Sequence, residues 1–434
     1  MDATAHPRSC NLSYMRSLTI AETVRRVVVV VGILLAAVWM TNVYPRAAHA
    51  QAIDADDRTA ESESGESQKA LSETTQRAES EPDTSTGDGE REESTAESSG
   101  QTDDAALLRE AFQLSKAAES IPQYDAVIDL AKRGLAAAES ETNRAYGRRL
   151  LSWTYNRRGE TYSALRDEVR AMSDFQAAVR LDPTRWQAIH NRGVSFAVQG
   201  RYDQARADFD RTIELRPNYA NAYFNRGELR SEQADYAGAI EDYNDALRFK
   251  PNDSAALNSR GHAHYRLGNY RAAHDDYTAA IRADANNAAA YTNRGDALAD
   301  LGYWARAATD YRTAIRIDPA LGRAYQSAAW LMATCPDERY RNADLAIEAA
   351  EKAIELDSDD DYRYQDTLAA AFANAGQFPE AVAVQEKVLE KVPEENAGRY
   401  RQRLALYQQG SPYREAAVAR RPSAASATGE PQRR

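Results

Sequence analysis

A segment of 34 residues, from Trp186 to Tyr219, recurs in register along most of the chain. Counted from Trp186 as position 1, position 8 is glycine, position 20 alanine, position 24 aromatic and position 32 proline. Five copies share the pattern, in the glycines Gly159, Gly193, Gly227, Gly261 and Gly295, the alanines Ala171, Ala205, Ala239, Ala273 and Ala307, the aromatics Phe175, Phe209, Tyr243, Tyr277 and Tyr311, and the prolines Pro183, Pro217, Pro251 and Pro319, with Ala285 as the exception. Such a fixed period indicates a solenoid of stacked units.

Each copy contains two runs of helical periodicity. The first run ends at Gly200 and the second ends before Pro217, so one copy predicts a helix, a short turn and a second helix. The small residues Gly193 and Ala205 allow the two backbones to approach closely, and Phe209 fills the space beside them. Because one hairpin cannot bury its apolar face alone, the hairpins must stack on one another.

Glycine at position 8, alanine at 20, an aromatic at 24, alanine at 27 and proline at 32 resemble the tetratricopeptide repeat family. The resemblance covers roughly residues 108 to 393. It implies an all-α fold, a right-handed superhelical α-solenoid of stacked helix-turn-helix hairpins. Members of this family mostly hold other proteins, so the resemblance is specific for fold and much less specific for function.

The chain divides by composition and period into six segments. We expect a signal peptide at 1–50, an acidic disordered linker at 51–104, a degenerate helical hairpin at 105–151, repeats at 152–395, a capping helix at 396–416 and a disordered tail at 417–434. The repeats start at residues 152, 186, 220, 254, 288, 322 and 362. The repeat from Gly322 carries an insertion of five residues after Met332, in which Pro336 stops one helix and Asn342 suits the N-cap of the next.

The amino terminus has the plan of a secretory signal. Arg25 and Arg26 precede an apolar run of 14 residues from Val27 to Met40, and Ala48-His49-Ala50 follows. The run is short for a membrane span of about 20 residues. We therefore expect export to the periplasm or another extracytoplasmic site, and an uncleaved signal anchor is the alternative.

The linker explains the acidic charge of the chain. It holds 17 acidic against 4 basic residues, a net charge of −13, whereas the whole chain carries −12. A segment so charged, without aromatics, cannot bury enough apolar area to fold. The rest of the chain is close to neutral, which does not suggest a nucleic-acid binder.

Few residues suggest chemistry. A lone cysteine in the insertion, Cys335, is either structural or reactive. His264 and His274 stand at similar distances from one turn, with Asp275 and Asp276 close by, so a two-histidine, one-carboxylate metal site is conceivable; otherwise His264 replaces a core aromatic. No phosphate loop or Ser-His-Asp set is recognisable. We expect no enzyme activity, no metal and no cofactor.

The resemblance implies a protein or peptide partner on the concave side. In this family the first helix of each repeat lines that side, chiefly through positions 2, 5, 6, 9, 12 and 13. The candidate contacts are His190, Asn191, Phe224, Asn225, Glu228, Asn258, Arg266, Thr292, Asn293 and Asp296. None of these positions is lysine in the five regular repeats, which disfavours the clamping of a carboxylate tail. The alternative function is a spacer that positions something else at the cell surface.

The asparagines at position 6 leave two interpretations open. An asparagine amide both donates and accepts, so Asn191, Asn225 and Asn293 could read the backbone of an extended peptide. Equally, they could bridge neighbouring helices within the solenoid.

A charged ladder runs through the regular repeats. Position 7 is arginine and position 23 is aspartate in all five, and both positions become apolar together in the two later repeats. This co-occurrence predicts five pairs within repeats, Arg158–Asp174, Arg192–Asp208, Arg226–Asp242, Arg260–Asp276 and Arg294–Asp310.

Overall fold

A computed structural model describes residues 104–357 and 361–416, which divide into two compact units at residues 284 and 285. The segments expected as a signal, as a linker up to residue 103 and as a tail from residue 417 lie outside these residues. Every regular element in the described part is helical, with no strand, so the chain is all-α. None of the described helices is both long and apolar enough to span a membrane.

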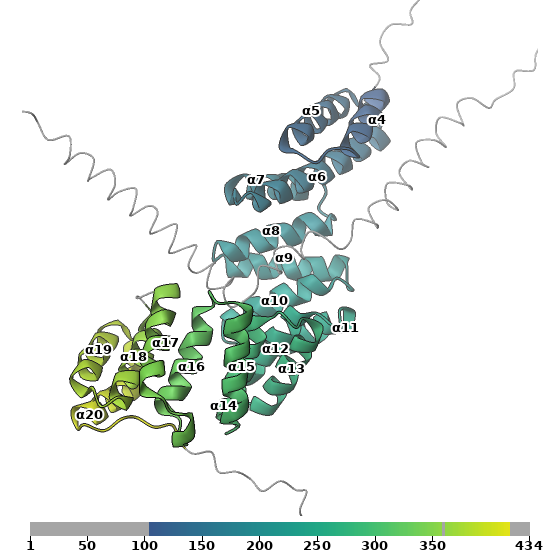
Figure 1. Ribbon diagram of the computed structural model, residues 1–434. Coiled ribbons are helices and arrows are strands. Elements are labelled where there is room, and N and C mark those ends of the chain that lie inside the picture. Colours follow the sequence, from purple (N-terminus) through teal and green to yellow (C-terminus); the bar gives the residue numbers. More distant parts are fainter. Residues whose placement is uncertain (1–103, 358–360, 417–434) are drawn as a thin grey trace, which may run out of the picture. The chain divides into compact units, whose positions relative to one another are not determined.

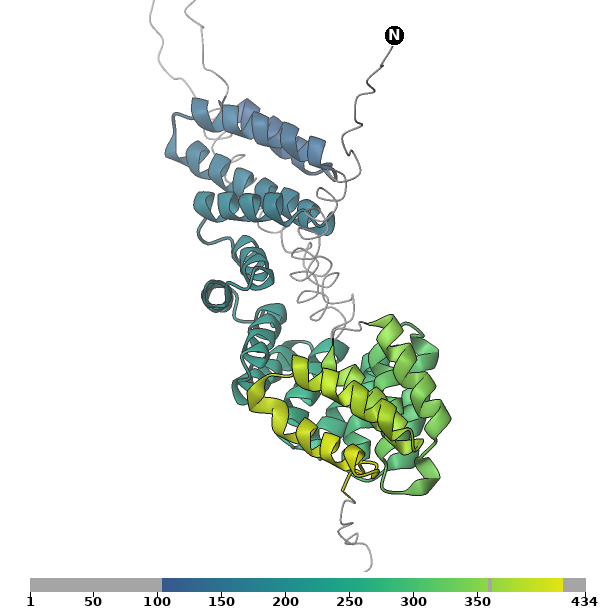
Figure 2. The ribbon, with the colours of Figure 1, turned by 90° about the vertical axis from the view of Figure 1, so that its left-hand side faces the viewer.

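The first unit consists of helical hairpins that follow one another along the chain. Figures 1 and 2 show each helix of this unit beside the preceding one. Its helices are α4 (Asp104–Ser115), α5 (Ile121–Ala137), α6 (Glu141–Ala164), α7 (Glu168–Leu181), α8 (Trp186–Val198), α9 (Tyr202–Leu215), α10 (Ala220–Glu232), α11 (Tyr236–Phe249), α12 (Ser254–Arg266) and α13 (Tyr270–Ala283).

The second unit continues the same alternation. Its helices are α14 (Ala288–Asp300), α15 (Trp304–Ile317), α16 (Gly322–Thr334), η1 (Glu338–Tyr340), α17 (Ala343–Leu356), α18 (Tyr362–Asn374), α19 (Phe378–Lys391), η2 (Glu394–Asn396) and α20 (Ala397–Gln408). The expected helix stop before Pro336 is confirmed, because α16 ends at Thr334. The N-cap at Asn342 is also confirmed, since its side chain accepts a hydrogen bond from the Leu345 amide.

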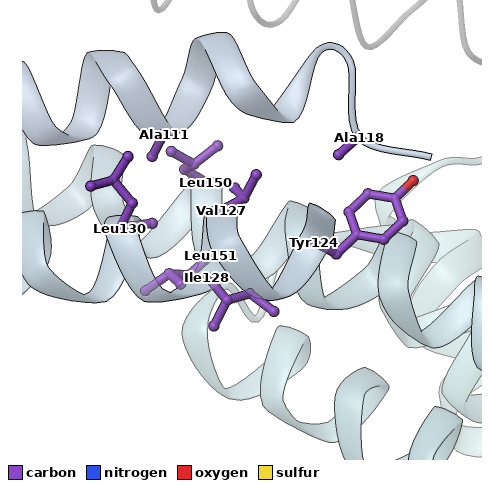
Figure 3. Packing of buried hydrophobic residues seen from close by; sticks show 9 residues of the cluster. Ala111, Ala118, Tyr124, Val127, Ile128, Leu130, Leu150 and Leu151 are labelled. Carbon is purple, nitrogen blue, oxygen red and sulfur yellow. The ribbon is translucent and has the colours of Figure 1, made fainter. Parts of the chain in front are cut away.

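The degenerate first hairpin packs onto a long third helix. Val127, Ile128 and Leu130 of α5 meet Ala111 of α4, and Leu150 and Leu151 of α6 complete the cluster (Figure 3). Helix α6 has 24 residues and runs through the expected domain boundary between residues 151 and 152. The hairpin and the first regular repeat therefore share one continuous helix.

Within a repeat, the two helices approach closely at position 8. A Cβ atom added at Gly227 would lie 2.8 Å from Cε1 of Tyr243, which is closer than real Cβ atoms come. The aromatic ring at position 24 thus occupies the space that a larger residue at position 8 would need. Every first helix from α6 to α10 also contacts the first helix of the next repeat, as do α14 and α16 in the second unit.

The expected capping helix is present at the end of the array. It is α20, which ends at Gln408, and Gly410 adopts a φ of +67° where the helix stops, so the helix fills the first part of the segment 396–416. Residues 411–416 are not helical, and they return to the ends of α16 and α18.

Candidate functional site

The charged ladder is paired within repeats. Arg192 donates from Nε and Nη2 to the two carboxylate oxygens of Asp208, at 2.8 and 2.7 Å. The same two-bond arrangement joins the other four predicted pairs, so the prediction of intra-repeat pairing is confirmed. The aspartates are all buried. These arginines fix the hairpins and are not free to bind a ligand.

Some ladder arginines also reach the preceding repeat. Arg226 Nη1 donates to Asp210 at 2.6 Å, and Arg260 Nη1 donates to Asn244 at 2.7 Å. Burial disfavours the charged guanidinium of Arg226, but its hydrogen bonds to Asp242 and Asp210 outweigh burial and raise its pKa. The ladder therefore holds each hairpin together and also links neighbouring hairpins.

A row of hydrogen bonds runs across the first helices of the first unit. We call it the amide row, and it consists of Asn156, Glu160, His190, Asn191 and Asn225. Asn191 Nδ2 donates to Asn156 Oδ1 at 3.1 Å and to Glu160 Oε1 at 3.0 Å. Asn225 Nδ2 lies 2.8 Å from His190 Nε2. For Asn191 and Asn225 the structure therefore shows the bridging of neighbouring helices.

The second unit contains a similar bond. Gln326 at position 5 donates from Nε2 to Thr367 Oγ1 at position 6 of the following repeat, at 2.9 Å. The rule common to both units is that position 6 of one repeat bonds to position 5 of the repeat before it. These bonds satisfy polar groups between packed helices, where an unpaired amide would be costly.

The amide row is interrupted between α10 and α12. Position 6 of α12 is Ser259, which is fully buried, and its Oγ has no hydrogen-bond partner in the described chain. Position 5 of α10 is Phe224, which offers no amide or imidazole to receive a bond. At this step the two first helices are thus held by packing, and an aromatic side chain takes the place of the polar bridge.

Phe224 packs in a hydrophobic cluster whose tyrosines, Tyr236 and Tyr243, contact charged groups. We call Phe224, Glu228, Tyr236 and Arg266 the Phe224 patch. The Phe224 ring lies 6.0 Å from that of Tyr243, whose hydroxyl donates to Glu228 Oε1 at 2.6 Å. The Arg266 guanidinium lies 4.6 Å from the centre of the Tyr236 ring. Phe224, Glu228 and Tyr236 are half-buried, and Arg266 is exposed.

The ten predicted contact residues separate into two groups by exposure. His190, Asn258, Thr292 and Asn293 are buried, between 1 and 6% exposed, so a ligand on the surface does not reach them. The others are Asn191, Phe224, Asn225, Glu228, Arg266 and Asp296, which are partly or fully exposed. Asp296 is itself engaged, because it accepts hydrogen bonds from Tyr311 at 2.9 Å and from Arg323 at 2.8 Å.

Sequence reasoning missed Tyr236, because it is the first residue of a second helix. An available signal was the aromatic residue that recurs at position 17, as Tyr202, Tyr236, Tyr270, Trp304 and Phe378. Placed at the start of the second helix, this ring packs in the cluster that includes Phe224.

The residues considered for chemistry are not assembled into a site. His274 Nδ1 lies 3.0 Å from Asp275 Oδ1, and no group of three metal-ligating side chains suited to a metal ion occurs among the described residues. Cys335 is a buried free thiol, packed with Leu298, Tyr311 and Leu331, and burial raises its pKa. A raised pKa keeps the thiol protonated and less reactive.

Comparison with known proteins gives one family. A family model described as tetratricopeptide repeat matches residues 190–254 and 258–321, and a second model of the same description matches residues 154–185. No curated protein matches the chain.

Several solved structures are similar in fold. A tetratricopeptide repeat protein from Parabacteroides merdae is 18% identical, covers 59% of this chain and 98% of its own, and has a TM-score of 0.45. The pilF protein of Pseudomonas aeruginosa is 17% identical. The match covers 51% of this chain and 99% of pilF, with a TM-score of 0.45. YrrB, described as a TPR protein with an unusual peptide-binding site, is 20% identical. The match covers 40% of this chain and 89% of YrrB, with a TM-score of 0.35.

Proposed function

This chain is a tetratricopeptide repeat protein, and from that premise we propose that it is an exported scaffold that binds a protein or peptide partner along its first helices. The family is typically a non-catalytic scaffold, and we propose neither a reaction nor a cofactor for this chain. The partner class that this fold favours is a protein or peptide, rather than a nucleic acid.

The Phe224 patch is the single observation that carries the proposal. The amide-row residues of the first unit bond to each other, so they hold the array together and have little left to offer a ligand. Phe224 instead presents part of an aromatic ring, packed against the same cluster as Tyr236, over which the guanidinium of Arg266 lies. An aromatic anchor flanked by charges of both signs suits an apolar side chain on an extended peptide.

Export is proposed from the amino-terminal sequence alone. The basic residues, the apolar run at 27–40 and Ala48-His49-Ala50 support secretion with cleavage. Mass spectrometry of the mature amino terminus tests this, and we expect Gln51 first, or Ile53 if the second cleavage register is used. An intact amino terminus in the membrane fraction would show a signal anchor instead.

Affinity capture from the extracytoplasmic fraction tests the binding function. We compare the wild type with Phe224→Ala and with Phe249→Ala, a control that removes a half-buried phenylalanine from a second helix. We expect Phe224→Ala to lose the captured partner, and Phe249→Ala to retain it. Thermal unfolding of both variants checks that a loss of binding is not a loss of fold.

The outcomes separate the two functions considered. Capture that survives Phe224→Ala at unchanged stability would remove the patch from the binding surface. If no partner depends on the repeats at all, the array is a spacer that only positions another molecule.

A further inference from the structure

The carboxyl end of α16 is built unlike that of the regular first helices. In the repeat from Trp186, Gly200 adopts a φ of +71° and the Arg201 amide donates to the Phe196 carbonyl at 2.9 Å. This is the usual way to satisfy the last carbonyls of a helix. After α16 no residue adopts positive φ before α17 begins, because Pro336 and the inserted loop replace this turn.

The chain's own carboxyl-terminal segment satisfies the last two carbonyls of α16 instead. We call Ser411–Glu415 the strap. Arg414 Nη1 donates to the Ala333 carbonyl at 2.8 Å, and the Glu415 amide donates to the Thr334 carbonyl at 2.9 Å. A positive guanidinium at the carboxyl end of a helix is also favoured by the helix dipole. Residues about 80 positions apart thus make the bonds that a local turn makes elsewhere.

The strap also makes side-chain contacts with α16 and α18, the first helices of the last two repeats. The Tyr413 ring lies 6.0 Å from that of Trp330 on α16, and Arg403 lies over both rings, at 5.3 and 5.4 Å. Arg414 Nη2 donates to Asn374 Oδ1 of α18 at 2.8 Å, and Trp330 Nε1 donates to Glu415 Oε1 at 3.2 Å. Three successive strap residues are therefore recognised by side-chain contacts.

These contacts occupy the positions that bind partners in this family. Trp330, Ala333 and Thr334 are positions 9, 12 and 13 of one repeat, and Asn374 is position 13 of the next. The strap has no regular secondary structure and contacts both α16 and α18, as a bound peptide would. It thus shows what chemistry this surface accepts: an aromatic residue, an arginine and an acidic residue in succession.

We propose that the surface formed by Trp330, Ala333, Thr334, Asn374 and Arg403 is a peptide-binding site whose resident ligand is the strap. A partner with an extended aromatic–arginine–acidic sequence binds there by replacing the strap. The inference deepens the proposed function and rests on it, since it takes the first helices as the binding face. It concerns the second unit, whereas the Phe224 patch belongs to the first.

Tethering explains why a partner must compete. A segment joined to its site by a short connection has an effective concentration in the millimolar range or above. A free peptide with the same contacts therefore binds the wild-type chain weakly. Weakening the strap removes this competition without altering the surface.

The experiment supplies the strap as a separate peptide. A fluorescent peptide with the sequence of residues 410–416, GSPYREA, is titrated by anisotropy into the wild-type chain and into a variant with Tyr413→Ala, Arg414→Ala and Glu415→Ala. We expect the variant to bind the peptide at least about tenfold more tightly, because of the lost tether. A scrambled peptide is the control, and Arg414→Ala alone serves if the triple variant does not fold.

Two results would overturn the proposal. A folded strap variant that does not bind the peptide would make the strap a permanent structural clasp. Equal binding by wild type and variant would place the peptide elsewhere. Adding Trp330→Ala to the strap variant should abolish peptide binding. Partner capture that depends on Phe224 is measured separately, so the two proposals fail independently.

Discussion

Asn225 Nδ2 lies 2.8 Å from His190 Nε2, across the contact between α10 and α8. Because the amide nitrogen can only donate, Nε2 must be unprotonated, and the Nδ1 hydrogen then points to Asn191 Oδ1, 3.3 Å away. The contact therefore requires a neutral imidazole. Burial lowers the pKa of His190, the bond to Asn191 opposes this and the charge of Lys250 adds to it, and together they bring the pKa to about 4.

This histidine predicts a pH-dependent stability. Unfolded, its pKa is about 6.5, so below that pH the unfolded chain binds a proton that the folded chain does not. The free energy of unfolding should fall by roughly 2–3 kcal/mol between pH 7 and pH 4.5 from this group alone. Urea unfolding of the wild type and of His190→Asn at both pH values measures it. Asparagine is present at the same position of the preceding repeat, as Asn156. The His190→Asn variant should therefore lose less stability than the wild type between pH 7 and pH 4.5. An equal loss of unfolding free energy in the wild type and the variant would exclude His190 as the source of the pH dependence.

The second prediction compares two carboxylates that bond to the same arginine, Arg226. Asp242 has a side chain 2% exposed and Asp210 one 47% exposed, and both accept hydrogen bonds from Arg226. Asp242→Ala removes the buried partner and leaves the half-buried Arg226 guanidinium with only the exposed Asp210, so it should cost about 3–5 kcal/mol. Asp210→Ala should cost about 0–1 kcal/mol, because solvent already screens that pair. Chemical denaturation compares them, and similar costs would show that burial does not decide the strength of the ladder.

The regular hairpins could be predicted from the sequence because they are determined by residues close together in the chain. Helices α8, α10, α12 and α14 begin at the residues where the period places a repeat. The pairing of the ladder followed from co-occurrence, since an arginine without its aspartate would be stranded. These features depend on residues within one period of each other.

The candidate site was less predictable, because burial depends on neighbouring repeats. Whether Asn191 faces a ligand or the previous helix is decided by Asn156 and Glu160, and nothing in its own repeat distinguishes the two. The contacts of the strap could not be predicted for the same reason, since Arg414 contacts Ala333 only after the chain has turned back. The period carries no information on contacts of this range.

The third prediction concerns the turn between α10 and α11. Ala234 has a φ of +62° where four other repeats have glycine, as at Gly268. A left-handed conformation costs a residue with a side chain about 1–2 kcal/mol. Ala234→Gly should therefore raise the free energy of unfolding by about 1 kcal/mol, less the greater entropy of glycine in the unfolded chain. Ala237→Gly, an exposed site within α11, is the control and should destabilise by about 1 kcal/mol. If Ala234→Gly destabilised as the control does, the positive φ would not be a source of strain.

The last repeat replaces the ladder by a different buried ion pair. Arg403 of α20 donates to both carboxylate oxygens of Asp366 on α18, at 2.9 and 2.8 Å, and both side chains are 8% exposed. Gln385 Nε2 donates to the same carboxylate at 2.9 Å. Because Arg403 also lies over Tyr413, this pair connects the cap, the last repeat and the strap.

The fourth prediction is that this pair holds the carboxyl-terminal cap in place. Arg403→Met leaves Asp366 buried and uncompensated, and should cost about 3–5 kcal/mol. Adding Asp366→Asn removes the stranded charge and keeps an acceptor for Gln385, so it should restore roughly half of that loss. Hydrogen exchange of the α20 amides measures the opening of the cap locally, where global unfolding would average over the array. A double variant as unstable as Arg403→Met alone would mean that packing by the arginine, rather than its charge, secures α20.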